Sequence, residues 1–233
     1  MKLIICAGPA TTGKTSVLRH ITRKLLEKGK KVAYLKVDVQ YADEDEVFAQ
    51  EFGIPVKKVY SGELCPDHCN VMVLGEAMEW AKGLQSDVLL AETAGLCLRC
   101  SPYVDGGLGI IVIEATSGMN LPLKIGPMLT LADIAVVTKI DRVSQAEREV
   151  FRARIQEAAP SVKIREVNAL HGIGIDPLIE FIEKTPEAGD NLLLRGNPPV
   201  GTCTICVGKK EIGWKQHFGV VRAIEGDLFY RGE

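Results

Sequence analysis

The sequence predicts an α/β fold, a mostly parallel sheet flanked by helices, followed by a small β-rich C-terminal appendage. Two observations predict it. Through residues 1–186, short apolar runs typical of buried strands alternate with amphipathic stretches of helical length, as in βαβ units. Beyond residue 186 this alternation ends, and a Pro-Pro pair, a Cys-x-x-Cys and two β-like runs follow. We therefore expect one domain over residues 1–186 and an appendage over residues 187–233 that is too short to bury much core alone.

The expected elements follow from apolar runs and helical spacing, taken in chain order. Buried strands are predicted at short, mainly apolar runs: 3–7, 32–35, 56–60, 88–90, 110–113, 134–137 and 162–167. Helices are predicted where apolar residues recur at helical spacing, as Val17, Ile21 and Leu25 do: about 15–28, 45–51, 66–82, 121–131, 144–158 and 176–184. In the appendage, 218–224 and 228–230 are interpreted as strands.

The composition is that of an ordinary globular protein and excludes several classes. The chain has 233 residues, 46% of them apolar and 25% charged, which excludes disorder and collagen-like repeats. Its 28 Lys and Arg against 30 Asp and Glu give a net charge of −2, which argues against nucleic acid as a partner. No apolar run approaches the roughly 18 residues of a membrane helix, and the apolar start is too short for an export signal. We expect a cytoplasmic protein with no membrane partner.

Residues 8–15, GPATTGKT, match the pattern G-x-x-x-x-G-K-[ST] after an expected strand and before an expected helix. The glycines let backbone N–H groups approach phosphate oxygens, and the helix N-terminus adds positive potential. Lys14 is expected to reach the β- and γ-phosphates, and the Thr15 hydroxyl to coordinate Mg²⁺. The chain is therefore predicted to be a P-loop NTPase with these nucleotide contacts in the loop: Gly8, Thr11, Thr12, Gly13, Lys14, Thr15 and Ser16.

Thr138, Lys139 and Asp141 come directly after an apolar strand and resemble the [NT]-K-x-D base-recognition motif of GTPases. One carboxylate at a strand end can accept hydrogen bonds from both the ring N–H and the exocyclic amine of guanine, a donor pair that adenine lacks. The stem of Lys139 can cover the ring face. The next strand is followed by a segment that sits where GTPases place a backbone amide against the guanine O6: Asn168, Ala169 and Leu170. GTP is therefore favoured over ATP.

The order of these motifs resembles that of the nickel-metallochaperone GTPases for hydrogenase and urease maturation, the HypB/UreG group. Residues 38–40, DVQ, are similar to a HypB segment, and residues 92–95, ETAG, resemble the E-x-x-G of this group. Residues 118–124, GMNLPLK, followed by Gly126 and Pro127, are similar to UreG. The resemblance covers residues 1–186, and the combination of motifs is more specific than any one of them.

The resemblance implies roles for two carboxylates and one glycine. Asp38 and Glu92 would help Thr15 to bind Mg²⁺, directly or through water, and one of them, with Asp38 as the candidate, would position the attacking water. Gly95 would contact the nucleotide. The catalytic set is then Lys14, Asp38 and Glu92, and the alternative is that both carboxylates are solvated side chains at strand ends.

Six of the seven cysteines fall in close pairs: Cys65/Cys69, Cys97/Cys100 and Cys203/Cys206. In a reducing cytosol such pairs are more often metal ligands or redox thiols than disulfides. The seventh, Cys6, lies within an apolar strand and is interpreted as a small core residue.

The first two pairs point to a transition-metal site. Pro66 suits a first helical position, which places Cys65 at the N-terminus of a helix and allows His68 and Cys69 to share its side of the first turn. Cys97 and Cys100 follow the 92–95 segment, so a metal held there would respond to the nucleotide state. The expected ligands are Cys65, His68, Cys69, Cys97 and Cys100, and thiolate-rich sets suit Ni²⁺, Zn²⁺, Cu⁺ or an iron–sulfur cluster.

The cysteine pattern departs from the family that the sequence resembles. HypB and UreG bind metal at a subunit interface through Cys-His or Cys-Pro-His, whereas this chain has Cys-Pro-Asp-His, Cys69 and a second Cys-x-x-Cys. Cys203 and Cys206 lie in the appendage, where they could form a separate metal site, complete the first one, act as a thiol pair or simply pack. HypB and UreG lack such an appendage.

The sequence thus predicts a GTP-hydrolysing metallochaperone that uses GTP, Mg²⁺ and a transition metal, Ni²⁺ or Zn²⁺. By resemblance it would form a nucleotide-dependent homodimer and deliver the metal to a client metalloenzyme or another maturation factor. Three alternatives stay open. They are a CobW-like GTPase for zinc or cobalt and corrinoid metabolism, an iron–sulfur or redox protein regulated by nucleotide, and a small-molecule kinase.

Overall fold

The computed structural model describes residues 1–39, 44–61, 66–94, 101–196, 210–213 and 229–231. Its strands are β1 (Lys2–Ala7), β2 (Val32–Asp38), β3 (Val56–Tyr60), β4 (Val88–Glu92), β5 (Leu108–Glu114), β6 (Ile134–Thr138), β7 (Lys163–Glu166) and β8 (Phe229–Arg231). Its α-helices are α1 (Lys14–Glu27), α2 (Glu44–Phe52), α3 (Pro66–Gly83), α4 (Leu121–Lys124), α5 (Pro127–Thr130), α6 (Gln145–Ala158) and α7 (Asp176–Lys184).

The strands of the described residues form one sheet, in which the first strand is central. Within the described residues the order is β7-β6-β5-β1-β4-β2-β3-β8. Strands β1 to β7 pair in parallel, and β8 adds an antiparallel strand to the edge of β3. Strand β1, which leads into the phosphate loop, therefore lies between β4 and β5, and the carboxyl ends of β1, β2 and β4 meet at one edge.

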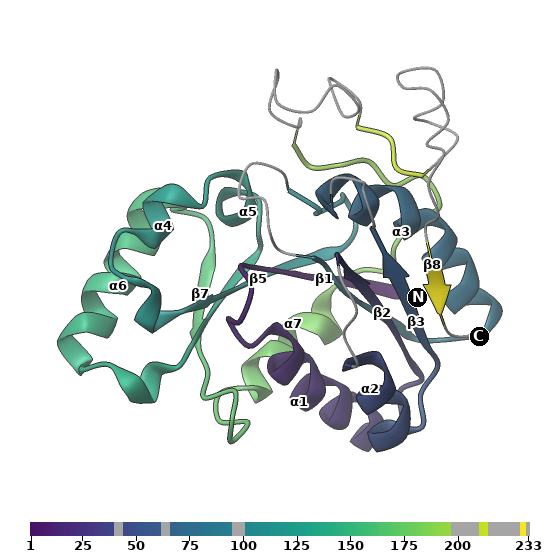
Figure 1. Cartoon of the computed structure of the whole chain (residues 1–233), viewed down its shortest axis with the longest axis horizontal. Helices are drawn as coiled ribbons and strands as arrows, with labels where there is room; N and C mark the ends of the chain where they lie inside the picture. The colour runs from purple at the N-terminus through teal and green to yellow at the C-terminus, as the bar shows by residue number, and fades with distance from the viewer. Residues whose placement is uncertain (40–43, 62–65, 95–100, 197–209, 214–228, 232–233) are drawn as a thin grey trace.

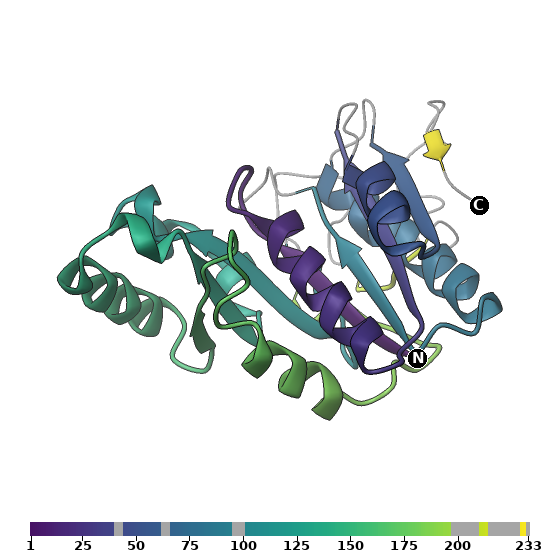
Figure 2. The same cartoon turned by 90° about the horizontal axis from the view of Figure 1, so that it is seen from below.

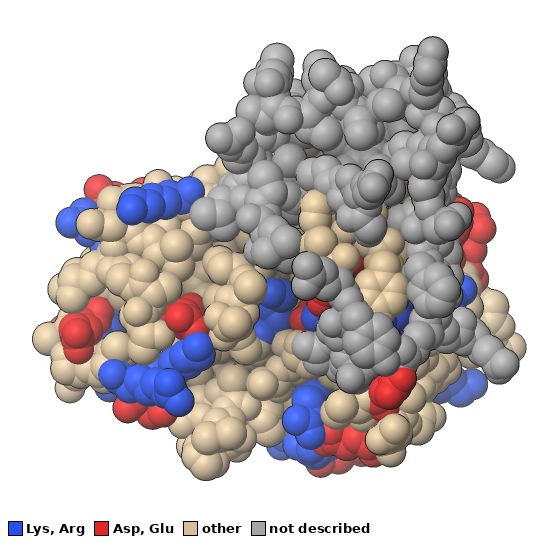
Figure 3. Space-filling model, viewed as in Figure 1, with Lys and Arg blue, Asp and Glu red and all other residues tan. Residues whose placement is uncertain are grey.

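Helices cover both faces of the sheet (Figures 1 and 2). On one face α1, α2 and α7 pack against alternate strand residues, including Ile4, Tyr34 and Val112. On the other face α3, α5 and α6 pack against the intervening residues, such as Ile5 and Leu35. The central strands β1, β4, β5 and β6 are therefore buried along almost their whole length, which explains their continuous apolar runs in the sequence. On the surface seen in Figure 3, the described basic and acidic side chains are interspersed.

The predicted α/β fold with a mostly parallel sheet is confirmed, and its elements begin and end close to the predicted residues. The stretch 121–131, expected to be helical throughout, is divided into α4 and α5. Gly126 has a φ of 58°, which a helix does not allow, and Pro127 at the first position of α5 supplies no N–H to an earlier carbonyl. Cys6 is fully buried in the core, as predicted.

Residues beyond 186 continue to pack on the main core before the chain leaves the described ranges. Ala188, Leu192 and Leu194 are buried in the same cluster as α3 and α6. Strand β8 overlaps the run predicted at 228–230, whereas the run predicted at 218–224 lies outside the described residues. Among the helices of the described ranges, none combines the length and apolar character needed to span a bilayer.

Arg195 fastens the segment after residue 186 to the base of the sheet. Its guanidinium lies 2.8 Å from the Asp133 carboxylate and donates to the carbonyl oxygens of Val104 at 3.1 Å and Leu131 at 3.0 Å. Arg195→Ala is therefore expected to lower the free energy of unfolding by about 2–3 kcal/mol, because several acceptors lose a charged donor. Urea unfolding followed by circular dichroism measures this change.

A matched control for Arg195→Ala is available on the surface. Lys184 is 78% exposed and lies 3.8 Å from Glu180, so Lys184→Ala is expected to cost less than about 0.5 kcal/mol. Equal effects of the two substitutions would show that residues 188–196 do not stabilise the domain.

Candidate nucleotide and metal site

The phosphate loop joins the end of β1 to the start of α1. Gly13 has a φ of 92° and stands immediately before the first helical residue, so the loop N–H groups and the helix N-terminus face the same space. Lys14 is largely buried, and its ammonium donates to the carbonyl oxygens of Gly8 at 3.0 Å and Pro9 at 2.9 Å. The loop thus has the conformation and the cation needed to hold phosphates.

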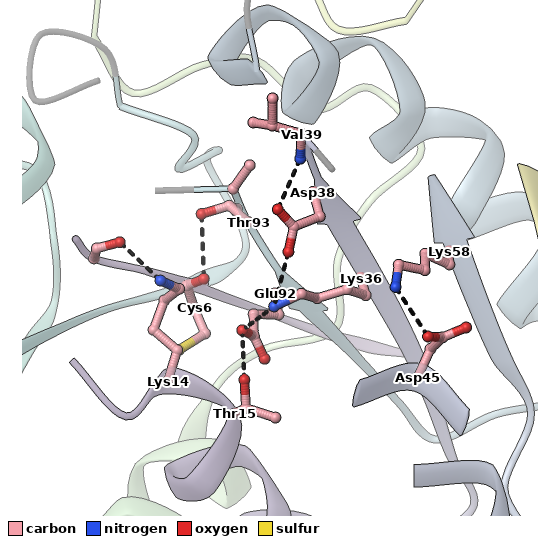
Figure 4. Close-up of polar contacts among 12 residues, drawn as sticks. Cys6, Lys14, Thr15, Lys36, Asp38, Val39, Asp45, Lys58, Glu92 and Thr93 are labelled. Carbon is pink, nitrogen blue, oxygen red and sulfur yellow. Dashed lines mark hydrogen bonds and ion pairs between the residues drawn. The ribbon is translucent and has the colours of Figure 1, made fainter. Parts of the chain in front are cut away.

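Two carboxylates stand next to this loop, at the ends of the strands predicted to carry them (Figure 4). The Thr15 hydroxyl donates to Glu92 Oε1 at 2.9 Å, so the predicted magnesium ligand on α1 contacts the last residue of β4. Asp38 ends β2, is partly exposed and accepts a hydrogen bond from the Val39 N–H at 2.7 Å. The structure therefore brings together Thr15, Asp38 and Glu92.

Glu92 has two further partners, Lys36 and Tyr34, which sequence reasoning missed. The Lys36 ammonium lies 2.5 Å from Glu92 Oε1, and the Tyr34 hydroxyl donates to Oε2 at 2.8 Å. A signal was available, because Lys36 stands between the apolar Leu35 and Val37, and alternation along β2 puts it on the same face as Tyr34 and Asp38. Recognising its partner also required the register that places Lys36 opposite Glu92.

The buried charges influence each other. Burial by itself raises the pKa of Glu92, but Lys36 and Lys14 outweigh it and hold that pKa below its ordinary value. Burial lowers the pKa of the Lys14 amine, and the Glu92 carboxylate opposes this effect. Glu92 is therefore an ionised carboxylate at neutral pH.

These residues line a pocket of about 340 Å³ that suits a phosphate group with a divalent ion. Its lining residues come from the phosphate loop, β2 and the end of β4: Ala10, Thr11, Gly13, Lys14, Thr15, Ser16, Lys36, Asp38, Glu92, Thr93 and Ala94. One hydroxyl and two carboxylates are hard oxygen donors of the kind that Mg²⁺ prefers. The donor set therefore fits the magnesium ion expected from the sequence.

The first residues predicted to bind the base end and follow β6, which lies on the opposite side of β1 from β4 and β2. The Thr138 hydroxyl donates to the Thr12 carbonyl at 2.6 Å, which ties the end of β6 to the phosphate loop. Lys139 has a left-handed φ of 54°, forms an ion pair with Glu114 and precedes the exposed Asp141. Glu114 was not predicted, and it holds the Lys139 side chain beside the end of β5.

The segment after β7 closes the same side of the site. The Asn168 side chain accepts hydrogen bonds from the N–H groups of Leu170 at 3.1 Å and His171 at 3.2 Å, which shapes a tight turn. The Ala169 carbonyl lies 3.0 Å from His20 Nε2 on α1. The turn is thereby joined to the helix that follows the phosphate loop, which the sequence did not indicate.

Most of the predicted transition-metal ligands lie outside the described residues: Cys65, Cys97, Cys100, Cys203 and Cys206, together with the glycine predicted to contact the nucleotide, Gly95. The backbone of His68 belongs to α3, but its side chain is not described. Cys69 is buried among apolar side chains of the core. No group of three or more candidate metal-binding side chains occurs within the described ranges. The transition-metal ligand set stays a prediction.

Two described residues that neighbour the first two cysteine pairs in the sequence nevertheless contact each other. Asn70, which follows Cys69 on α3, donates to the Ala94 carbonyl at 3.3 Å and accepts from the Ala94 N–H at 3.3 Å. Ala94 directly precedes the segment that contains Cys97 and Cys100. The first turns of α3 and the chain leaving β4 are therefore adjacent.

Comparison with known sequences agrees with this architecture. Residues 2–166 match the profile described as "CobW/HypB/UreG, nucleotide-binding domain". An uncharacterized protein of Methanocaldococcus jannaschii is 47% identical over 235 residues, covering 100% of both chains. The hydrogenase maturation factor HypB of Azotobacter chroococcum is 28% identical over 177 residues, 74% of this chain and 56% of that protein. The chain thus spans little more than half the length of that HypB.

Comparison with solved structures identifies the same fold. HypB from Helicobacter pylori, solved in complex with nickel, has a TM-score of 0.65 at 19% identity, covering 81% of this chain and 91% of that one. HypB from Archaeoglobus fulgidus has a TM-score of 0.61 at 21% identity, covering 78% and 89%. At these identities the likeness concerns the fold.

Proposed function

Because the chain belongs to the CobW/HypB/UreG family of P-loop GTPases, we propose that it uses GTP binding and hydrolysis to control the loading or delivery of a transition-metal ion. Support comes from the pair of hydrogen bonds between Asn70 and Ala94, which joins the helix bearing Cys69 to the chain that continues towards Cys97. The same chain begins at Glu92, which accepts from Thr15 of the phosphate loop. Within the described residues, the nucleotide site is thus linked through Glu92 and Ala94 to Asn70 of the helix that bears Cys69.

In the proposed reaction the chain supplies positioning and charge more than bond chemistry. The loop N–H groups and Lys14 hold the phosphates, and Thr15, Asp38 and Glu92 hold Mg²⁺, which when bound neutralises charge on the β- and γ-phosphates. Asp38 is the more exposed carboxylate and orients the water that attacks the γ-phosphate. Lys139, Asp141 and the turn at Asn168 hold the guanine base.

The cargo in this proposal is Ni²⁺ or Zn²⁺, bound by Cys65, His68, Cys69, Cys97 and Cys100. Nickel is favoured by the HypB complex that shares the fold, and zinc by the thiolate-rich ligand set. The receiving partner is a metalloenzyme or another maturation factor, and a nucleotide-dependent homodimer would hold the metal. Cys203 and Cys206 are proposed as a separate site.

An anaerobic titration with Ni²⁺, Zn²⁺ and Co²⁺ tests the proposal. We expect the metal affinity to differ by about tenfold or more between the complexes with a GTP analogue and with GDP. Cys97→Ser should weaken metal binding and remove this difference. The matched control is Cys6→Ala, which removes a thiol buried in the core and should leave the metal stoichiometry unchanged.

The same titration separates the alternatives. Equal metal affinity in every nucleotide state would contradict nucleotide-controlled delivery. Preference for Co²⁺ would favour a CobW-like role, and a brown, oxygen-sensitive protein would favour an iron–sulfur cluster.

A further inference from the structure

The phosphate pocket contains a second cation besides Lys14. Lys36 extends from the middle of β2 into the pocket, and its side chain is only 6% exposed. Its register partner across the parallel pair is Glu92, so the backbone itself sets the two side chains next to each other. Asp38, two residues further along β2, shares its face, and its Oδ2 lies 3.6 Å from the Lys36 ammonium.

The Lys36 ammonium lies among the side chains that are proposed to bind magnesium. Glu92 Oε1 accepts both from Lys36 at 2.5 Å and from the Thr15 hydroxyl at 2.9 Å (Figure 4). The ammonium therefore stands among Thr15, Asp38 and Glu92. A divalent ion cannot coordinate the same oxygens while a cation occupies that place, because like charges at this separation repel strongly in a buried site.

We propose that Lys36 is a tethered cation that occupies the magnesium position without nucleotide and donates to the terminal phosphate once a magnesium–nucleotide complex binds. The second half rests on the proposed GTP hydrolysis. Repulsion from the divalent ion displaces the ammonium from Glu92, and the terminal phosphate oxygens offer the nearest new negative charge. Lys36 thus keeps the empty site charge-balanced and adds a donor to the reacting group.

The competing explanation is that Lys36 only neutralises Glu92, as the buried Lys58 neutralises Asp45. Lys58 provides the comparison. It is fully buried on β3, and its ammonium lies 3.1 Å from the Asp45 carboxylate, away from the residues that line the pocket. Lys58→Met therefore removes a buried lysine from an ion pair without altering the proposed magnesium position, which makes it the matched control.

The first experiment measures Mn²⁺ binding without nucleotide by electron paramagnetic resonance. Lys36→Met and Lys36→Gln should bind Mn²⁺ about tenfold more tightly than the unmodified chain, because the competing cation is gone. Lys58→Met should bind as the unmodified chain does. Adding Glu92→Gln to either Lys36 variant should abolish the gain, which excludes binding by cysteine or histidine. An unchanged Mn²⁺ affinity in the Lys36 variants would overturn the proposal even if the protein hydrolyses no GTP.

The second experiment measures single-turnover hydrolysis and GDP affinity. The neutral variants should hydrolyse GTP about 100-fold more slowly, while their affinity for GDP, which lacks the terminal phosphate, should change less than about threefold. Unchanged hydrolysis would overturn the contact with the terminal phosphate. Thermal unfolding shows which variants are folded. If neither neutral variant folds, Lys36→Arg is used instead. This variant keeps a positive charge beside Glu92, so Mn²⁺ binding tighter than that of the unmodified chain would contradict the proposal.

Discussion

Gly8→Ala is expected to eliminate measurable GTP binding and to lower the free energy of unfolding by about 3 kcal/mol. A Cβ at this position would lie 2.1 Å from the Val112 carbonyl oxygen, and the φ of Gly8 is 146°. The obstacle is backbone in the middle of β5, so it cannot rotate away as a side chain would. The loop must then move off the sheet, and its N–H groups lose their alignment towards the phosphates.

The measurements are fluorescence titration with a labelled GTP analogue and urea unfolding. Gly29→Ala is the matched control, because Gly29 also has a positive φ, 71°, but a Cβ there would meet nothing within 4 Å. It should cost about 1 kcal/mol through strain alone and leave GTP affinity unchanged. Normal GTP binding by Gly8→Ala would show that the loop does not depend on its close approach to β5.

The features that could be predicted from the sequence are those that depend on the spacing of neighbouring residues. The phosphate loop and the motif at Thr138 each consist of consecutive residues. Their expected roles in binding phosphate and base could therefore be inferred without knowing where they lie in the fold. The break at Gly126 was also local, and it was missed because the apolar spacing on both sides continued the helical pattern.

Contacts between distant strands were outside the reach of that reasoning. The pairing of Lys36 with Glu92 depends on β2 lying beside β4, and the contact of His20 with Ala169 joins residues at opposite ends of the domain. Neither can be inferred from one segment, because strand order is decided by the packing of the whole sheet. The missed residues are accordingly those whose partners lie on another strand or helix, whereas the predicted site residues come from local motifs and stay predictions.

Asp141→Asn is expected to lower GTP affinity about 100-fold and to favour xanthosine triphosphate instead. The carboxylate has two acceptor oxygens for the ring N–H and amine of guanine, whereas an asparagine presents one acceptor and one N–H donor. The asparagine N–H would face the guanine amine, and because both are donors, neither would have an acceptor. Xanthine has a carbonyl oxygen in place of the amine and therefore restores the pair.

The position of Asp141 makes this substitution a clean test. The residue is exposed and lies two positions after Lys139, and its motif is joined to the phosphate loop by the hydrogen bond from Thr138 to Thr12. Competition against a labelled GTP analogue gives the affinities for GTP, ATP and xanthosine triphosphate. The control, Asp176→Asn, changes a carboxylate that is 80% exposed on α7 and should alter none of them. If Asp141→Asn left the ratio of GTP to ATP affinity unchanged, Asp141 would not read the base, and the preference for GTP would have to come from the turn at Asn168.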